Sequence, residues 1–130
     1  MRTELLSYLT ATITSSTFKV STELPWSSGV PLYVKNPKKV YVDMEQKSTE
    51  QVMAVLGNHG IFQQVDTLNV YLVTDAKNIP NDYASVVSLI EAGKNVASNE
   101  PYFKREVDSG ITFEGDLMIT QLEFRFTKLT

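Results

Sequence analysis

The sequence predicts an α+β protein with a mixed, largely antiparallel sheet and helices packed on one of its faces. Three observations lead to this fold class. Segments in which apolar and polar residues alternate recur along the chain, segments with helical spacing lie between some of them, and residues 102–129 have the pattern of one long β-hairpin. The expected order is α-β-β-α-β-α-β-β, and helices inserted between strands favour packing against one sheet face.

The N-terminal part of the chain predicts one helix and one strand. Leucines recur at helical spacing and predict an amphipathic helix over residues 2–12. A run rich in serine and threonine, residues 10–17, should end this helix, because these side chains compete for backbone hydrogen bonds. Residues 18–24 alternate apolar and polar, which is typical of a strand with one buried face, and Pro25 ends its ladder.

Residues 26–37 contain two prolines and a glycine, and we expect them to form a long connection or an extended arm. Trp26, Leu32 and Tyr33 lie in it, and such side chains are costly to leave in water. The arm therefore either folds back on its own core or lies on another chain. We favour slightly the intermolecular alternative, in light of the resemblance described below.

A second strand is predicted over residues 38–45. Val40, Val42 and Met44 should face inward, because they occupy alternate positions. Tyr41, Asp43 and Glu45 would then face the other way.

A second helix is predicted directly after this strand. Ser48 and Gln51 have the spacing of a capping box, with Ser48 as the N-cap residue. The helix should continue through Leu56 and end in the glycine-containing segment 57–60.

The third strand, residues 67–74, is the most apolar, which predicts a central place in the sheet. Asn81 or Asp82 then caps a further helix, in which Gly93 allows a close contact. This strand, this helix and the first hairpin strand are candidates for a right-handed crossover. The residues that this helix should bury are Tyr83, Val86, Val87, Ile90 and Ala97.

The C-terminal hairpin is predicted to turn at Glu114 and Gly115, since glycine readily adopts the positive φ of a tight turn. In that register Phe113 lies opposite Asp116, and one face of the hairpin is apolar. A one-residue bulge near Ser109 would change the register. The residues of the predicted core face are Phe103, Val107, Ile111, Phe113, Met118, Leu122, Phe124 and Phe126.

The other face of the hairpin is charged. In the same register Lys104 lies opposite Arg125 and Glu106 opposite Glu123, while the diagonal pairs have opposite signs. This pattern is typical of a solvated sheet face, or of a surface that meets a neighbouring subunit.

The composition limits the classes of function. One hundred and thirty residues suit a single domain, and the net charge of −3 argues against free nucleic acid as the main ligand. Without cysteine there are no disulfides and no thiolate metal sites. No apolar run is long enough to span a membrane, and Glu4 and Ser7 interrupt any signal-like segment at the N-terminus. We therefore expect assembly in a cytoplasm.

Motifs of catalysis are scarce. His59, the one histidine, is expected in a surface turn that ends a helix, and one histidine without cysteine cannot build a usual zinc site. Asp43, Glu45 and Lys47 occupy alternate positions, which on a strand would point them to one side. This is half of the pattern of Mg²⁺-dependent nucleases, whose upstream Pro-Asp dipeptide is absent here. We therefore expect no enzyme, no catalytic or metal-binding residues and no cofactor.

Five segments in order resemble the tail terminator proteins of long-tailed bacteriophages. They are FKVSTELPW (residues 18–26), KKVYVD (38–43), VYLVTDAK (70–77), FKREVD (103–108) and LEFRFTK (122–128). Each segment alone is a generic strand, and the specificity lies in the ordered set. The resemblance covers nearly the whole chain, so that residues 1–130 would form one tail-terminator-like domain.

The resemblance implies a structural virion protein. Such a protein forms a homohexameric ring that caps the phage tail tube, stops its polymerisation and joins it to the head connector. Its partners would be other copies of itself, the tube protein and a head-completion or connector protein. DNA would pass through the ring without specific binding, no membrane would be involved, and the ring would be assembled in the cytoplasm of the bacterial host.

Three alternatives stay open at this point: a minor tail or head–tail completion protein, a small Mg²⁺-dependent nuclease, and a non-viral adaptor domain. For the ring, the candidate residues of a subunit or tube interface are Trp26, Leu32, Tyr33, Lys35, Lys38, Lys39, Asp75, Lys77, Lys104, Glu106, Glu123 and Arg125.

Overall fold

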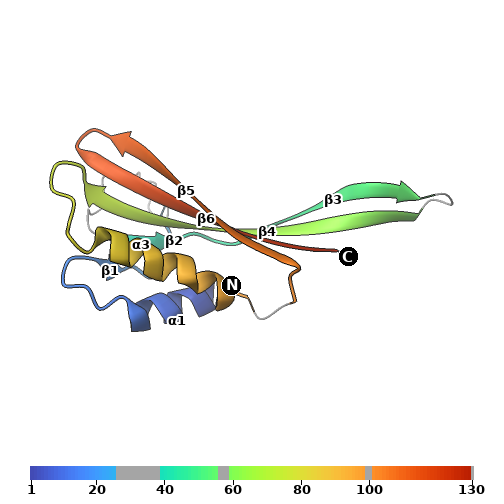
Figure 1. The fold of residues 1–130 in the computed structure, drawn as a ribbon, viewed down its shortest axis with the longest axis horizontal. Coiled ribbons are helices and arrows are strands. Elements are labelled where there is room, and N and C mark those ends of the chain that lie inside the picture. The colour runs from blue at the N-terminus through green and yellow to red at the C-terminus, as the bar shows by residue number, and fades with distance from the viewer. Residues whose placement is uncertain (26–38, 56–58, 99–100, 130) are drawn as a thin grey trace.

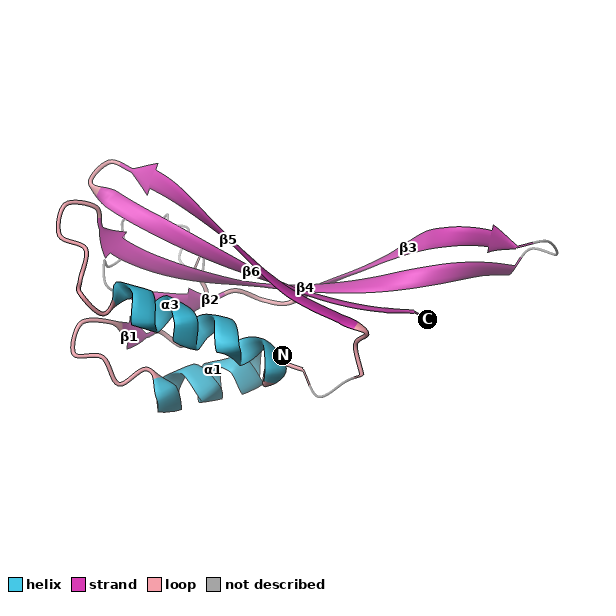
Figure 2. Cartoon of the chain, in the orientation of Figure 1, coloured by secondary structure: helices cyan, strands magenta, loops and turns pink. Residues whose placement is uncertain are grey.

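The computed structural model describes residues 1–25, 39–55, 59–98 and 101–129, and it describes residues 50–55 and 59–61 by their backbone alone. These residues form an α+β fold with two α-helices and a six-stranded, mostly antiparallel open sheet (Figures 1 and 2). The elements are α1 (Arg2–Thr12), β1 (Lys19–Val20), β2 (Lys39–Val42), β3 (Gln46–Val55), β4 (His59–Asp75), α3 (Tyr83–Ala92), the 3₁₀ turn η1 (Gly93–Asn95), β5 (Lys104–Glu114) and β6 (Leu117–Leu129).

Strand β4 is the centre of the sheet, as its apolar sequence predicts. It pairs with β6 along one side and with β2 and then β3 along the other, all antiparallel. Strand β1 adds to β2 in parallel, and β5 adds to the outer side of β6. Because β4 and β5 are both antiparallel to β6, they run in the same direction, as a crossover through α3 requires.

The core lies between the two helices and one face of β2, β4 and β6 (Figure 1). Helix α1 buries Leu5 and Leu9 there, and α3 buries Val86 and Ile90. The strands contribute alternate residues to this face, which is why their sequences read apolar at every second position. These strand residues are Val40, Val42, Leu68, Val70, Leu72, Leu122, Phe124 and Phe126.

The two helices touch closely at Gly93, as the sequence predicts. A Cβ atom at this position would lie 2.6 Å from Cδ1 of Leu5, and the Tyr8 hydroxyl donates a hydrogen bond to the carbonyl of Leu89 over 2.9 Å. The prediction of α1 over residues 2–12 is confirmed, as is the start of α3 after Asp82. Ala97 is also buried, whereas Tyr83 and Val87 are partly buried.

The helix predicted from the Ser48–Gln51 capping box is wrong. Residues 46–55 form strand β3, which pairs with β4 from Gln46 opposite Thr67 to Val55 opposite His59. The capping pattern is only a local preference, and β4 offers this segment a long ladder of backbone partners instead. His59 therefore lies in a strand rather than in a helix-ending turn.

Two of the predicted strands are shorter than expected. The first one is reduced to Lys19–Val20, followed by one further hydrogen bond from Ser21 N to Val40 O over 2.8 Å. The second one ends at Val42, so the alternation does not continue to Met44, which is 52% exposed instead of buried.

The C-terminal hairpin is present, with a register two residues away from the predicted one. The turn is Gly115–Asp116, with Gly115 at a φ of 59°, so that Phe113 lies opposite Met118. A shift by two residues keeps each side chain on its predicted face. The β6 half of the predicted core face is indeed buried, whereas the β5 half is not, as described below.

The outer part of β4 leaves the helix-covered body together with β3 (Figure 1). We call this projecting pair, residues 46–55 and 59–67, the hairpin arm. Strand β6 accompanies the arm as far as the pair of Gln63 with Leu129, and beyond that pair the described arm consists of two strands.

Candidate assembly surfaces

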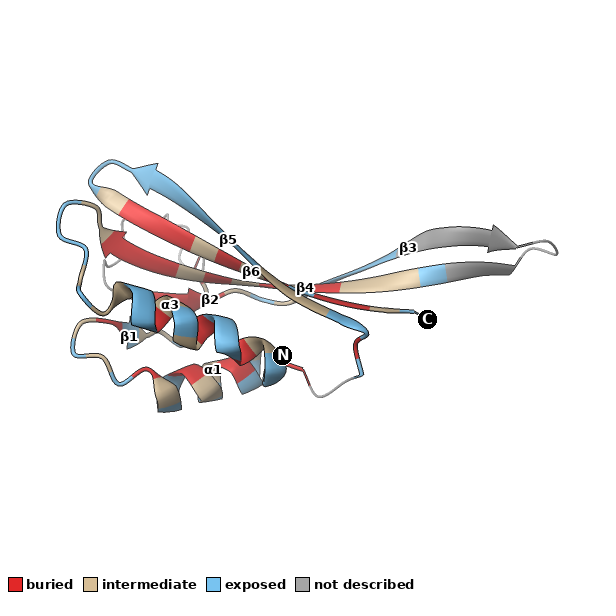
Figure 3. Ribbon diagram, in the orientation of Figure 1, coloured by how far each residue is buried: buried red, intermediate tan, exposed pale blue. Residues whose placement is uncertain are grey.

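Strand β5 forms one edge of the sheet and exposes large apolar side chains. Phe103, directly before the strand, is 61% exposed, and Ile111 and Phe113 within it are 54% and 64% exposed. Figure 3 colours the strand as exposed over most of its length. The prediction that these side chains belong to the core is wrong, because α1 and α3 pack over β2, β4 and β6; of the core residues predicted on β5, Val107 alone packs against that core, and it is partly buried. Among the described strands β5 pairs with β6 alone, so one side of its backbone has no strand partner.

The charged face of this hairpin has a different arrangement from the predicted one. Glu106 lies opposite Arg125, Lys104 opposite Thr127, and Glu123 opposite Asp108. The ion pairs join neighbours on the same strand: Lys104 Nζ lies 2.7 Å from Glu106 Oε1, and Arg125 Nη2 lies 3.0 Å from Glu123 Oε1. The four side chains are between 32% and 57% exposed. Ion pairs exposed in this way contribute little to stability. They form a solvent-facing surface.

Two further predicted interface residues lie beside the turn of the β5–β6 hairpin. Lys77 Nζ is 3.7 Å from Asp116 Oδ1, and both side chains are largely exposed. The Asp75 carboxylate accepts a hydrogen bond from the backbone N–H of Lys77 over 3.0 Å, and Ala76 N donates to the carbonyl of Asp116. Asp75 therefore shapes the chain as it leaves β4, whereas Lys77 is available at the surface.

The extended arm predicted over residues 26–37, which is distinct from the hairpin arm, can be compared with the structure only near its end. Trp26, Leu32, Tyr33, Lys35 and Lys38 lie outside the described residues. The last predicted residue of that region, Lys39, is half-buried in β2, between Lys19 of β1 and Val73 of β4.

The sheet face away from the helices carries a second, smaller apolar cluster. Tyr41, Val73 and Ile119 are buried there, with Tyr71 partly buried beside them. Burial raises the pKa of the Tyr41 hydroxyl, and the negative charge of Glu23 adds to this effect. Burial also raises the pKa of Tyr71, with smaller contributions from Asp43 and Glu123.

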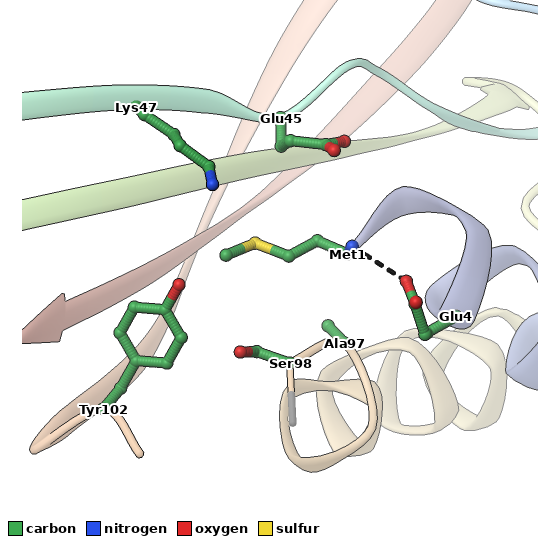
Figure 4. A pocket seen from close by; sticks show the side chains of 7 residues that line it. All are labelled: Met1, Glu4, Glu45, Lys47, Ala97, Ser98 and Tyr102. Atoms are coloured by element: carbon green, nitrogen blue, oxygen red, sulfur yellow. Dashed lines mark ion pairs between the residues drawn. The ribbon is translucent and has the colours of Figure 1, made fainter. Parts of the chain in front are cut away.

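A pocket of about 210 Å³ lies where α1, η1 and the base of the hairpin arm meet (Figure 4). Glu45 and Lys47 stand on one side of it and Tyr102 and Ser98 on the other. Glu45 Oε2 is buried without a hydrogen-bond partner among the described residues. The residues that line this pocket are Met1, Glu4, Glu45, Lys47, Ala97, Ser98 and Tyr102.

The three residues of the nuclease hypothesis do not converge. Glu45 and Lys47 line the pocket on the helix side, whereas Asp43 lies near Tyr71 and accepts a hydrogen bond from the backbone N–H of Met44 over 2.8 Å. The expected single-sided arrangement is wrong because residues 43–45 lie between two strands, where the alternation is interrupted. Among the described residues, no three His, Cys, Asp or Glu side chains gather to hold a metal ion.

A polar cluster around the buried Asp66, at the base of the hairpin arm, was not predicted from the sequence. Asp66 is fully buried and accepts hydrogen bonds from the Tyr102 hydroxyl and from Gln64 Nε2, the latter over 2.9 Å. The Lys128 ammonium lies 5.2 Å above the Tyr102 ring. We call these four residues the waist cluster. Its one sequence signal is that Asp66 lies two positions before the buried Leu68 on β4, so that both side chains point to the same face of the sheet.

Comparison of the sequence with protein-family models and with curated proteins gives no match. In the part of the chain that the structure describes, neither helix has the length and apolar character needed to cross a bilayer.

Proposed function

We propose that this protein is a structural subunit that assembles into a ring at the head-proximal end of a phage tail tube. The ring would consist of six copies, stop the polymerisation of the tube and join it to the head connector. The assembly part of this proposal is supported by the surfaces described above, and the tail part by the resemblance to tail terminator proteins.

The hairpin arm is the observation that carries the assembly proposal. Beyond the pair of Gln63 with Leu129, the described residues form two strands with no helix over them (Figure 1). A two-stranded ribbon in water is marginally stable on its own, so a projecting one gains stability when a second molecule packs against it. A neighbouring subunit or the tube would supply that contact.

The arm is also attached firmly enough to present a defined surface. The waist cluster joins its base to β6 and to the segment before β5, because Asp66 of β4 holds Tyr102 through a buried hydrogen bond. Fixing the base sets the direction in which the arm projects, so less orientational freedom remains to be lost when it binds. A closed ring needs two different patches that meet head to tail, and an arm on one side of a subunit supplies one of them.

The charge of the chain suits a DNA passage. With a net charge of −3, the ring lining can repel phosphate, so that DNA moves through without adhering. A minor tail or head–tail completion protein would share the ring and the arm. The two alternatives differ in the partner, because a terminator binds the end of the tube itself.

Shortening the arm tests the proposal. We would join Glu50 to Gln63, which lie opposite each other, through an Asn-Gly turn, and compare this variant with the full chain. Native mass spectrometry and electron microscopy should show six-membered rings for the full chain, alone or on tail tubes. The shortened variant should unfold at a similar temperature and form none. Rings of normal size from the shortened variant would contradict the role of the arm.

A further inference from the structure

We propose that two copies of this chain pair through their β5 edges, as a two-fold antiparallel dimer centred on Ser109. The two sheets would then become one continuous sheet. This inference goes beyond the ring, because it uses the sheet edge on the side of β4 that lies away from β3 of the hairpin arm. It rests on the described residues of β5 alone.

The first support is the state of the β5 edge. The strand is 11 residues long, its outer side has no strand partner among the described residues, and Ile111 and Phe113 are more than half exposed. Long apolar edges are where sheets join other chains, and soluble proteins usually shorten, charge or cover them. A second copy of the same edge would cover both its backbone groups and its apolar side chains.

The second support is the charge pattern, which is self-complementary in one register. When Ser109 faces its own counterpart, Lys104 lies opposite Glu114 of the second copy, and this pair occurs twice by symmetry. Val107 lies opposite Ile111, an apolar pair of the kind that stabilises sheets. No two like charges are then directly opposite each other.

The neighbouring registers lack this complementarity. A two-fold axis perpendicular to the sheet leaves the helix-side residues of both copies on the same face of the joined sheet. Such an axis also places one residue of β5 opposite the same residue of the second copy. Centring on Val107 sets Glu106 against Asp108, and centring on Asp108 sets that carboxylate against its own copy. Centring on Gly110 sets Glu114 against Glu106, and centring on Ile111 sets Glu114 against Asp108. Directly opposed like charges are unfavourable, so the Ser109 register is selected.

The residues near the proposed axis permit close approach. Ser109 and Gly110 are small and exposed, and even a Cβ atom added at Gly110 would meet nothing within 4 Å. Asp108 would lie opposite this glycine, where its side chain keeps access to water. Both pairs of helices would lie on the same side of the joined sheet.

Cysteine cross-linking tests the register directly, because the natural chain has no cysteine. Directly opposite residues of an antiparallel pair have Cα atoms about 4.5–5.5 Å apart, within reach of a disulfide or a short bis-maleimide. Ser109→Cys should therefore yield a covalent dimer. Thr112→Cys, also at an exposed position of the same strand, is the matched control, because the two copies of Thr112 would be ~20 Å apart. Equal cross-linking at both positions would overturn the register.

Charge exchange tests the same contact without a covalent bond. Lys104→Glu or Glu114→Lys alone should shift the chain toward monomer in sedimentation or light scattering, and the double variant should restore the dimer. A general effect of surface charge would not be reversed in this way. A natural chain that stays monomeric at high micromolar concentration, or a double variant that stays monomeric, would overturn the proposal. The arm-shortened variant should still dimerise, which separates this proposal from the ring.

Discussion

The hydroxyl of Tyr102 donates a hydrogen bond to the buried carboxylate of Asp66 and thereby connects the segment before β5 with the central strand. A buried carboxylate that loses a donor bears the full cost of its lost hydration, about 1–3 kcal/mol. We expect Tyr102→Phe to lower the free energy of unfolding by that amount in a denaturant titration. Phe103→Ala, next to it and exposed, should change it little. Equal effects would mean that the hydrogen bond does not stabilise the fold.

Phe124 and Phe113 lie on the same face of neighbouring strands, yet one is fully buried and the other 64% exposed. Phe124→Ala should lower the free energy of unfolding by roughly 3–5 kcal/mol, because it removes a large side chain from a packed core. Phe113→Ala should cost less than about 0.5 kcal/mol in the monomer. Thermal or denaturant unfolding of both variants measures the difference.

The contact of Gly93 with Leu5 gives a prediction whose sign is informative. Helix propensity alone would make Gly93→Ala stabilising by up to about 1 kcal/mol. A Cβ atom 2.6 Å from the buried Leu5 side chain should instead make it destabilising, by roughly 1–3 kcal/mol. Leu5→Ala combined with Gly93→Ala should cost less than the two single changes added together. Gly110→Ala, in open space, is the control and should be nearly neutral.

The raised pKa values of Tyr41 and Tyr71 predict a loss of stability at high pH. Each group ionises in the unfolded chain near its ordinary value of 10.0 but stays protonated to higher pH in the folded one. Its contribution is therefore complete below pH 10 and is lost as the pH rises through the folded-state pKa. Denaturant titrations at rising pH should show this decline, and Tyr71→Phe should make it shallower. A decline unchanged in that variant would exclude this origin.

The nuclease alternative predicts an outcome that we do not expect. Asp43 is partly exposed and lies outside the hairpin arm, and Lys47 lies at the base of the arm, where β6 still accompanies β4. Asp43→Ala and Lys47→Ala should therefore leave assembly largely intact. DNA incubated with Mg²⁺ and either the natural chain or one of these variants should stay uncleaved. Reproducible Mg²⁺-dependent cleavage by the natural chain that both changes abolish would contradict a purely structural role.

Much of the fold follows from periodicity. The leucines of α1, the apolar run around Val70 and the alternation of Leu122, Phe124 and Phe126 each predict the observed element and its buried face. The segment around Ser48 could not be predicted, because its strand depends on the ladder of β4, which is a property of the tertiary structure. Local capping preference is weak compared with such a ladder.

The surfaces were predicted less well than the core. Ile111 and Phe113 follow the alternation of a buried strand. Nothing in the local sequence indicates that the two helices do not cover this part of β5. The charged residues Lys104, Glu106 and Arg125 are predicted to form either a solvated face or a subunit interface. They lie at the surface of the chain, but their partners differ from the predicted ones because the register is shifted. Asp66 does carry a sequence signal, because an acidic residue at a core-facing position requires a buried donor.

The place of β6 between β4 and β5 determines when the chain can fold. The central strand β4 is synthesised well before β6, its longest partner, and Gln63 of β4 pairs with Leu129 of β6. The contacts that β4 makes with Phe124 and Phe126 therefore cannot form on the nascent chain until these two residues have left the ribosome. Pairing between segments so distant in sequence is slow, so the core of this protein should close only once β6 has been synthesised, and chaperones can protect the open edge of β4 until then.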